Sequence, residues 1–282
     1  MNENEIKSLL YLLEDPDPFV QQSVEGRLHE LGEKVVPILD EHKEVLEDGE
    51  GIERLNRIIR TITFDNLEQD FLDYLTDGLD TMERLEEAIW MLVRFHEPAF
   101  RAQPYKQKLD RMARTIHEDI TYSLDDRKRM RLLIDYVFNK LQFEGDIENY
   151  HDAHNSYMNS VMDRGKGIPI SLALVVLFLA RRLEIPFYGV NMPIHFMLNY
   201  KSDQHDLLID PFDGGSVVTR NQCYQFLMKN GVRPKAEHFE VATHKEILTR
   251  YIRNIIHNYA RIHEDSRVEQ MQKLLNAAET ML

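Results

Sequence analysis

Apolar residues in the first half of the chain recur every three to four positions, the spacing that lets a helix bury one face. One such stripe runs from Phe19 to Leu31 and closes at Gly32, a residue type favoured just beyond a helix C-terminus. Residues 1–46 are therefore expected to form three short helices, broken at the proline-rich segment 15–18. The same spacing predicts further helices over residues 52–62, 67–76, 82–96, 104–119 and 125–142.

The pattern changes after Gly145. Residues 147–157 are polar and irregular, which is typical of a loop. Residues 170–183 are apolar on nearly all sides, which predicts a fully buried helix. Pro169 stands at the start of this run, where proline is favoured because its missing N–H costs no helical hydrogen bond.

Short strand-like segments follow the buried helix, and they set the expected fold class. Alternation within one of them places His195, Met197 and Asn199 on the same face. Thr219 is expected to cap another helix. The predicted strands span 187–191, 195–200 and 207–210, and the last three helices span 220–229, 244–262 and 265–281. We expect a helix-rich α+β fold in which a small antiparallel sheet packs on one central buried helix.

Composition and charge exclude several classes of protein. The 282 residues include one Cys, so no internal disulfide can form, and the longest apolar stretch, Leu172–Ala180, is too short to span a membrane. The first residues carry no apolar leader, so a cytoplasmic location is expected. Residues 1–100 carry nine Lys and Arg against 25 Asp and Glu, a balance of −16 within the overall −14. Neither nucleic acid nor an anionic membrane surface is an expected partner of such a chain.

The region after Gly145 contains residue types that resemble parts of a hydrolase. In thiol-dependent hydrolases and acyl transferases a thiolate lies at a helix N-terminus, a histidine takes its proton, and an acid orients the histidine. Here His195 and Asp210 supply the last two residue types in order. No cysteine stands at the helix start, so the attacking group is the open question.

Several motifs in order resemble a known family. They are Gly-Ile-Pro-Ile-Ser-Leu-Ala at 167–173, Ala-Arg-Arg-Leu-Glu-Ile-Pro at 180–186, His-Phe-Met-Leu at 195–198 and Leu-Ile-Asp-Pro-Phe-Asp-Gly-Gly at 208–215. Together they are similar to the core of transglutaminase-like proteins. With the run at 155–172 and the lead-in at 143–146, they more closely resemble the SirB-type branch of that superfamily. The resemblance covers about residues 80–282.

Two other segments resemble helical repeats. Residues 12–20 and 31–37 are similar to one HEAT-type repeat, and the last two helices are similar to a tetratricopeptide-type pair. The expected domains are a HEAT-like region over 1–75, a transglutaminase-like domain over 76–240 with a helical lead-in at 76–145 and a core at 146–240, and a tetratricopeptide-like hairpin over 241–282.

The resemblance implies a Cys, His and Asp triad in active members. A gap-free alignment puts the nucleophile position on Pro169, which has no attacking atom, while His195 and Asp210 take the other two positions. Ser171 and Cys223 are alternative nucleophiles. The structural interpretations are a hydroxyl that satisfies backbone groups in the first helical turn for Ser171, and a small buried apolar side chain for Cys223.

Polar residues before the buried helix are further candidates. Asn155, Tyr157 and Arg164 are expected to line the same cleft as His195 and Asp210, or else to serve only as caps and ion-pair partners. No metal site or cofactor is predicted, because His151 and His154 stand close together without further ligands and the chain has no phosphate-binding loop.

These observations favour a non-catalytic transglutaminase-like protein that binds a peptide or protein partner, and the resemblance suggests a regulatory role. The alternative is a hydrolase or acyl transferase that uses Ser171 or Cys223 with His195 and Asp210. A third interpretation is a structural scaffold that acts through its acidic N-terminal helices. At Pro193–Phe196 the chain reads Pro-Ile-His-Phe where the resembling branch usually reads Pro-Gly-His-Phe, which bears on how closely a ligand backbone can approach Ile194.

Overall fold

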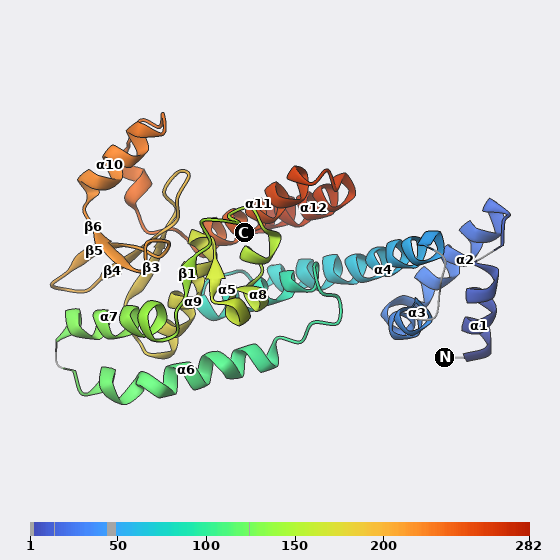
Figure 1. Ribbon diagram of the computed structural model, residues 1–282, viewed down its shortest axis with the longest axis horizontal. Helices are drawn as coiled ribbons and strands as arrows, with labels where there is room; N and C mark the ends of the chain where they lie inside the picture. Colours follow the sequence, from blue (N-terminus) through green and yellow to red (C-terminus); the bar gives the residue numbers. More distant parts are fainter. Residues whose placement is uncertain (1–2, 14, 44–48, 124) are drawn as a thin grey trace. The chain divides into compact units, whose positions relative to one another are not determined.

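The computed structural model describes residues 3–13, 15–43, 49–123 and 125–282. The chain divides into two compact units (Figure 1). Unit 1 comprises Met1–Asp73 and Arg94–Ala99, and unit 2 comprises Tyr74–Val93 and Phe100–Leu282. Among the described residues, no helix combines the length and the apolar character needed to cross a lipid bilayer.

Unit 1 is helical. Its elements are α1 (Glu3–Leu12), α2 (Pro18–Leu31), η1 (Gly32–Val35), α3 (Val36–Lys43) and most of α4 (Gly49–Thr76). Asp17 caps α2 by accepting the N–H of Phe19, and Gly32 ends it with a φ of 66°, as predicted. The core of unit 1 is formed by apolar side chains of all four helices and η1: Ile6, Leu10, Leu13, Val24, Leu28, Val35, Val36, Leu39, Leu55, Ile58, Ile59 and Ile62. Residues 1–2, 14 and 44–46 of the predicted helical region lie outside the described residues.

The two helices predicted over 52–62 and 67–76 are in fact one, α4. The polar residues between them do not end the helix, because Thr63 Oγ1 donates to the carbonyl of Ile59 and Asn66 Nδ2 donates to the carbonyl of Ile62. Back-bonding of this kind satisfies a polar side chain within a helix.

Unit 2 combines helices with two small sheets, so the predicted α+β class is confirmed. Its elements, after the end of α4, are α5 (Met82–Val93), α6 (Gln103–Thr121), α7 (Asp126–Asp135), η2 (Tyr136–Lys140), β1 (Glu144–Gly145), η3 (Ala153–Asn155), α8 (Met158–Arg164), β2 (Lys166–Gly167), α9 (Pro169–Arg182), β3 (Phe187–Val190), β4 (Met197–Lys201), β5 (Asp206–Asp210), β6 (Ser216–Val218), α10 (Arg220–Lys229), η4 (Ala236–Phe239), α11 (His244–Arg261) and α12 (Asp265–Met281).

Helix α9 is the centre of unit 2. Every residue from Pro169 to Ala180 is buried, as its all-round apolar sequence predicts, and the helix contacts α5 to α8 as well as β3 and β4. Its C-terminal end is anchored by charge. Arg182 bonds to the buried carboxylate of Glu86 at 2.7 Å and to Asp110 at 2.7 Å, which complements the helix dipole and ties α9 to α5 and α6. The N-terminal end of α9 is therefore held in a fixed place.

The main sheet is antiparallel with the order β3-β4-β5-β6. The register pairs Gly189 with Leu198, Leu198 with Ile209, and Ile209 with Val217. Two details differ from the sequence prediction. Strand β4 begins at Met197, so His195 lies in the preceding turn and not within a strand. Strand β6 was not predicted, because three residues give no measurable alternation.

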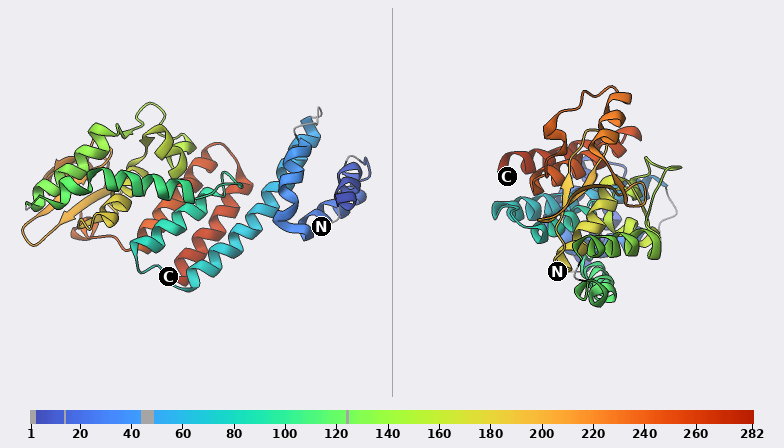
Figure 2. Two further views of the ribbon diagram at one scale, coloured as in Figure 1. Left: turned by 90° about the horizontal axis from the view of Figure 1, so that it is seen from below. Right: turned by 90° about the vertical axis from the view of Figure 1, so that its left-hand side faces the viewer.

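The ends of the later helices follow from their sequences. Thr219 and Gln222 form a capping box at the start of α10, and Thr243 and Glu246 form another at α11. Helices α11 and α12 lie side by side and antiparallel, since Lys245 at the start of α11 bonds to the carbonyl of Glu279 near the end of α12 (Figure 2). This pair matches the predicted helices closely and packs within unit 2.

Candidate functional site

His195 and Asp210 form a hydrogen-bonded pair at the ends of two strands. His195 Nε2 lies 2.8 Å from Asp210 Oδ1, and the two side chains are 13% and 21% exposed. The same carboxylate oxygen accepts the N–H groups of Phe212 at 2.9 Å and Asp213 at 3.3 Å. Burial opposes the charge on Asp210, but the hydrogen bond and the charge of His195, together with these N–H groups, hold its pKa below the ordinary value. An ionised Asp210 can only accept hydrogen bonds, so Nε2–H of His195 is the donor to it. Nδ1 of His195 then remains for another partner.

Two hollows lie beside His195. The first, here called the Pro169 hollow, has a volume of about 10 Å³ and is lined by Tyr150, Ile168, Pro169, Ile170, Ile194, His195, Phe196, Arg250 and Asn254. The second, the Cys223 hollow, has a volume of about 160 Å³ and is lined by Met192, His195, Met197, Asp210, Val218, Gln222, Cys223 and Phe226. The Pro169 hollow has room for roughly one water-sized group. The Cys223 hollow is larger and mostly apolar.

Pro169 is the first residue of α9 and shares the Pro169 hollow with His195. Ile194 stands at the rim of the same hollow with 48% of its surface exposed. Its φ is 58°, in the left-handed region that a β-branched side chain disfavours. Glycine adopts this conformation without a steric penalty, so it would fit this position with less strain than isoleucine.

Ser171 bonds to backbone groups at the start of α9. Its Oγ accepts the N–H of Ile168 at 3.0 Å and donates to the carbonyl of Asn155 at 2.7 Å, and the residue is fully buried. A Cβ on Gly167 would lie 2.6 Å from that oxygen, so the glycine makes room for it. These contacts fit the structural interpretation of Ser171, and no hydrogen bond joins its Oγ to His195.

Asn155 and Arg164 belong to a hydrogen-bonded network beneath the start of α9. Asn155 Nδ2 donates to the carbonyl of Asn149 at 2.7 Å and to the buried carboxylate of Asp146 at 3.1 Å. Arg164 donates to Asp146 at 3.3 Å and to Asn155 Oδ1 at 3.3 Å. Burial opposes the charge of Asp146, but the bonds from Asn149 and Asn155 and the charges of Lys166 and Arg164 lower its pKa. The network fixes the loop that leads into α8.

Tyr157 lies in a second buried contact. Its hydroxyl is 3.1 Å from the hydroxyl of Tyr259 on α11, and Arg267 on α12 donates to the latter at 3.1 Å. Burial, followed by the neighbouring Tyr259, raises the pKa of Tyr157 well above its ordinary value, so it stays a neutral phenol. None of Asn155, Tyr157 and Arg164 is among the residues that line the two hollows.

Cys223 on α10 lines the second hollow with Asp210. Burial, together with the negative charge of Asp210, raises the pKa of its thiol, which disfavours the thiolate form that attacks substrates. The residue is 5% exposed, and no hydrogen bond joins its sulfur to His195.

Comparisons with known proteins bear on the family of the chain. A family model described as the transglutaminase-like superfamily matches residues 103–253, more than half of the chain. The chain belongs to the transglutaminase-like superfamily. His195 and Asp210 both fall within the matched residues, as do Pro169, Ser171 and Cys223.

Individual relatives match over part of their length. A UPF0162 protein of Xylella fastidiosa is 37% identical over 136 residues, which is 44% of this chain and 47% of that protein. A UPF0162 protein of Vibrio cholerae is 24% identical over 185 residues, 64% of this chain and 68% of that protein. F-box only protein 21 of Mus musculus is 33% identical over 132 residues, 44% of this chain and 21% of that protein. The chain thus spans about half the length of the Xylella relative. No solved structure matches this chain.

Three further residues of the transglutaminase-like region line the Pro169 hollow without having been singled out from the sequence: Tyr150, Arg250 and Asn254. Arg250 and Asn254 are four residues apart on α11, so they share one face of that helix. The sequence signal that could have found them is the four-residue spacing of Arg250 and Asn254 beside the buried apolar residues of α11. It gives no indication of which loop the face meets, because His195 is more than fifty residues away in sequence.

Aromatic rings continue from His195 in both directions. Neighbouring ring centroids lie between 5.2 and 6.3 Å apart in the order Phe226, His195, Phe212, Tyr150, His151 and His257, here called the aromatic row. Phe212 packs against Gly145, where a Cβ would stand 2.6 Å from its ring. Edge-to-face contacts of this kind are favourable for aromatic pairs.

His151 and His154 have partners of other kinds. His151 contacts the ring of His257, and burial, with the charges of Arg261 and His257, lowers its pKa. His154 bonds to Asp152 at 2.8 Å. Across the described ranges of the chain, no three side chains of the types His, Cys, Asp and Glu are grouped as metal ligands would be.

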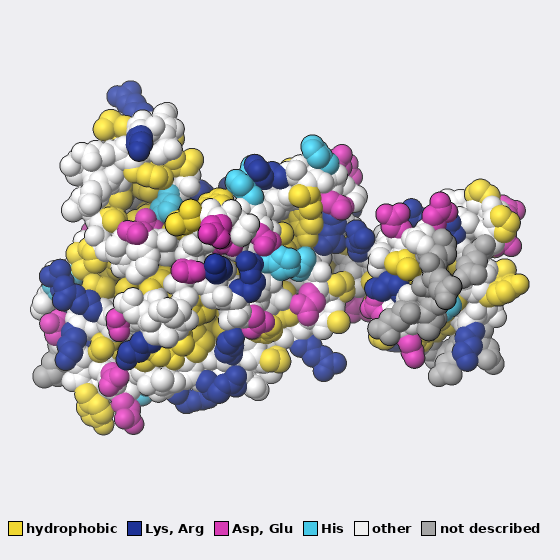
Figure 3. Space-filling model, viewed as in Figure 1, with side chains coloured by type: hydrophobic (Ala, Val, Ile, Leu, Met, Phe, Trp, Pro, Cys, Tyr) yellow, Lys and Arg dark blue, Asp and Glu magenta, His cyan; other side chains and the backbone are white. Residues whose placement is uncertain are grey.

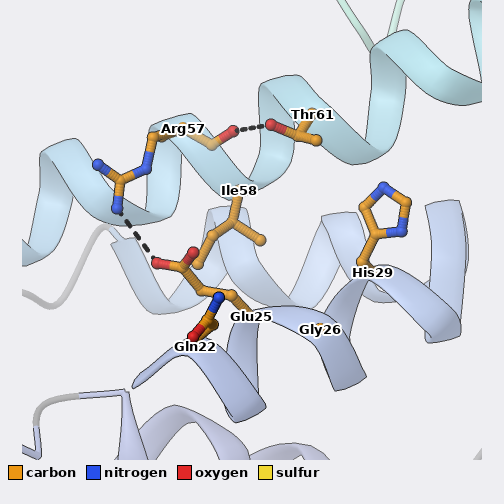
Figure 4. A pocket seen from close by; sticks show the side chains of 7 residues that line it. All are labelled: Gln22, Glu25, Gly26, His29, Arg57, Ile58 and Thr61. Carbon is orange, nitrogen blue, oxygen red and sulfur yellow. Dashed lines mark hydrogen bonds and ion pairs between the residues drawn. The ribbon is translucent and has the colours of Figure 1, made fainter. Parts of the chain in front are cut away.

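Unit 1 contains a larger hollow of about 400 Å³ between α2 and α4 (Figure 4). It is lined by Gln22, Glu25, Gly26, His29, Arg57, Ile58 and Thr61. Its charged groups pair internally, since Arg57 bonds to Glu25 at 3.1 Å and His29 bonds to Asp65 at 2.6 Å. Size alone does not make this hollow the better site. The hydrogen-bonded pair of His195 and Asp210 lies in unit 2.

Proposed function

We propose that this transglutaminase-like protein is non-catalytic and binds a peptide or protein segment at the Pro169 hollow, as a member of the SirB-type branch. The observation that carries the proposal is Pro169. It opens the central helix beside His195, at the position where the resemblance expects the attacking cysteine. A proline side chain offers no lone pair and no acidic proton for attack.

The alternative nucleophiles do not compensate for Pro169. Ser171 Oγ is already bonded to two backbone groups at the start of α9. The thiol of Cys223 has a raised pKa and lies beside a carboxylate that repels the thiolate. Nucleophilic catalysis requires the attacking atom within hydrogen-bond reach of its base, and neither residue bonds to His195.

Binding is supported by the surface around His195. The aromatic row offers apolar faces with polar edges, a combination enriched at protein interfaces. Phe226, at one end of the row, is 39% exposed on α10, and Figure 3 shows hydrophobic side chains at the surface of that helix. The Pro169 hollow is too small to enclose a substrate but sufficient for one polar group of a segment that lies across the surface.

Turnover is the first test. The wild-type protein is incubated with a glutamine peptide plus a fluorescent primary amine, and separately with ester and peptide libraries. We expect product at the rate of the buffer blank. Product formation that His195→Ala abolishes would refute the non-catalytic assignment, since His195 is the one imidazole paired with Asp210.

Binding is the second test. A phage-displayed library of random dodecapeptides is selected on the wild-type protein, and the enriched peptides are measured against two variants. Tyr150→Ala removes a ring of the aromatic row, whereas Tyr122→Ala removes a tyrosine that is 81% exposed at the end of α6. We expect about a tenfold loss of affinity for Tyr150→Ala and none for Tyr122→Ala. No enrichment, or equal losses, would count against peptide binding at this site.

A further inference from the structure

Arg250 differs from Arg182 in the kind of partner that it has. Arg182 is paired with the carboxylates of Glu86 and Asp110. Arg250 is half-buried and lines the Pro169 hollow, yet among the described residues no Asp or Glu pairs with it. A guanidinium that is partly removed from water is costly unless an anion accompanies it.

The side chain of Arg250 is held in place by neutral acceptors. Its Nη1 donates to Asn191 Oδ1 at 3.2 Å and to the carbonyl of Met192 at 3.4 Å, both in the segment between β3 and β4. A guanidinium has five N–H donors in a planar fork, so further donors remain after these bonds. Burial lowers the pKa of Arg250, which shows that water stabilises its charge poorly there, although an arginine stays protonated in a protein.

The neighbours of Arg250 in the hollow are also hydrogen-bonding groups. Tyr150 presents a hydroxyl whose pKa is raised by burial, so it remains a donor at neutral pH. Asn254, one helical turn from Arg250, presents an amide. His195 also lines the hollow, and its Nε2 is already bonded to Asp210. The hollow therefore combines the fixed positive charge of Arg250 with further hydrogen-bonding groups.

We infer that Arg250, with Tyr150 and Asn254, is the recognition site for a carboxylate of the bound segment, so that the ligand of the proposed peptide-binding site is an acidic peptide. This rests on the proposed function and names its ligand class. A single guanidinium matches a single planar carboxylate in a two-point hydrogen bond. The hollow has room for about one water-sized group, so a carboxylate would rest at its mouth with one oxygen inside. A side-chain carboxylate and a free C-terminus offer the same chemistry.

The probes for this inference are small blocked amino acids, which do not depend on having a selected peptide. N-acetyl-glutamate methylamide carries a side-chain carboxylate, N-acetyl-glutamine methylamide is its neutral match, and N-acetyl-alanine carries a terminal carboxylate. Affinities are measured by the NMR shift of the Arg250 Nε–H. We expect a Kd of the order of 1 mM for at least one acid and binding at least about fivefold weaker for the amide. The two acids distinguish a side chain from a chain end.

The variants separate a local site from general attraction. Residues 1–100 carry −16 of the overall −14, so residues 101–282 carry +2, and general attraction is tested by removing the same charge elsewhere on α11. Arg250→Gln is expected to bring the ratio of acid to amide affinity to about one, read by shifts of neighbouring backbone amides. Arg253→Gln, on the same helix but 54% exposed and paired with Glu279, is expected to leave the ratio unchanged. Should Arg250→Gln fail to fold, Arg250→Lys keeps the charge without the planar fork and is expected to lower acid binding at least about threefold.

The outcomes distinguish this inference from the proposed function. Equal binding of acid and amide, no binding of any probe at about 10 mM, or equal effects of Arg250→Gln and Arg253→Gln would overturn carboxylate recognition. Selected dodecapeptides could still bind in that case, and the proposed peptide site would stand. Conversely, acid-selective binding of the probes in a protein that enriches no peptide would refute the proposed function and leave the carboxylate site.

Discussion

The first turn of α9 has two sides that use their polar groups differently. On the inner side, Ser171, Asn155 and Arg164 bond to one another's backbones or to the buried Asp146. On the outer side, Pro169 faces a hollow where Arg250 has no acidic partner among the described residues and Nδ1 of His195 has no bond. The inner side is closed and the outer side has hydrogen-bonding capacity left over.

This difference shows how residues that stabilise the fold can be told apart from residues that could bind a ligand within one sequence motif. Asn, Arg and Tyr occur on both sides, so residue type does not distinguish them. What distinguishes them is whether the donors and acceptors are already satisfied within the fold, since a satisfied buried group contributes rigidity and an unsatisfied one at a surface hollow can bind a ligand. The comparison can be tested from both sides.

The largest effect is expected when a thiol is placed on either side. Starting from Cys223→Ala, which removes the sole cysteine, Pro169→Cys puts a thiol at the start of α9 in the hollow, and Ser171→Cys puts one in the buried network. The helix dipole and the nearby imidazole favour a thiolate at position 169. We expect it to react with methyl methanethiosulfonate about 100-fold faster at pH 7 than the thiol at position 171.

Intact-mass spectrometry over time gives both rates, and the Cys223→Ala parent serves as the unlabelled control. Fluorescence of Trp90, the single tryptophan and a buried residue of unit 2, shows whether each variant is folded. Similar rates in two folded variants would mean that the two sides of the turn are not chemically different.

The next effect concerns stability and uses two asparagines. Asn155→Ala removes donors to Asp146 and to the carbonyl of Asn149, leaving a buried carboxylate with fewer partners. We expect the free energy of unfolding to fall by about 2–3 kcal/mol, in line with the cost of an unsatisfied buried polar group. Asn254→Ala on the outer side is expected to change it by less than about 0.5 kcal/mol.

Urea titrations followed by Trp90 fluorescence compare the two variants directly, because Trp90 lies in the same unit as both asparagines. The contrast between the two sides fails if Asn254→Ala destabilises unit 2 as much as Asn155→Ala does.

A smaller effect with a defined pH dependence is expected at Asp210. Its pKa is lower in the folded chain than the ordinary value near about 3.9, so its ionisation contributes stability above about pH 4 that is lost as the pH falls through the folded value. Asp210→Asn is expected to cost about 1–2 kcal/mol near neutral pH, and the difference from wild type should shrink towards pH 3.

Unfolding by urea at a series of pH values measures this difference. Asp203→Asn, in the exposed turn between β4 and β5, is the matched control and should follow the wild-type curve. A cost for Asp210→Asn that is the same at pH 3 and near neutral pH would show that ionisation of Asp210 does not stabilise the fold.

Much of unit 2 could be predicted from local sequence. The all-round apolar run that forms α9, the Thr219 and Thr243 caps and the paired C-terminal helices each follow from residues close together in the chain. The continuity of α4 could not be predicted, because Thr63 and Asn66 are polar residues whose back-bonding within the helix leaves no trace in the pattern. The two-residue pairing of β1 with β2 is likewise too short to show a period.

Only part of the candidate site could be predicted from the sequence, for a related reason. His195 and Asp210 lie on neighbouring strand ends, and the order of their motifs indicates a pair. Arg250 and Tyr150 join them through tertiary packing of α11 and a loop, and no local pattern encodes that packing. The candidates Asn155, Tyr157 and Arg164 share the motif but bond inward, so their role as ligand contacts stays a prediction.

The smallest effect is expected at Ile194 on the outer side. In the described part of the chain, Ile194 is the one β-branched residue with a positive φ. A non-glycine residue in the left-handed region costs about 1–2 kcal/mol. Ile194→Gly should therefore be more stable than Ile194→Ala by about 1 kcal/mol. At Val217, similarly exposed on β6 but outside the left-handed region, alanine should be the more stable of the same two replacements.

Urea titrations of the four variants give the two differences. If alanine is at least as stable as glycine at both positions, Ile194 is unstrained. A reversal of sign between the positions would show that the chain tolerates backbone strain at the rim of the hollow. There, a hydrogen bond to Asp210 holds His195, and hydrogen bonds to Asn191 and Met192 hold Arg250.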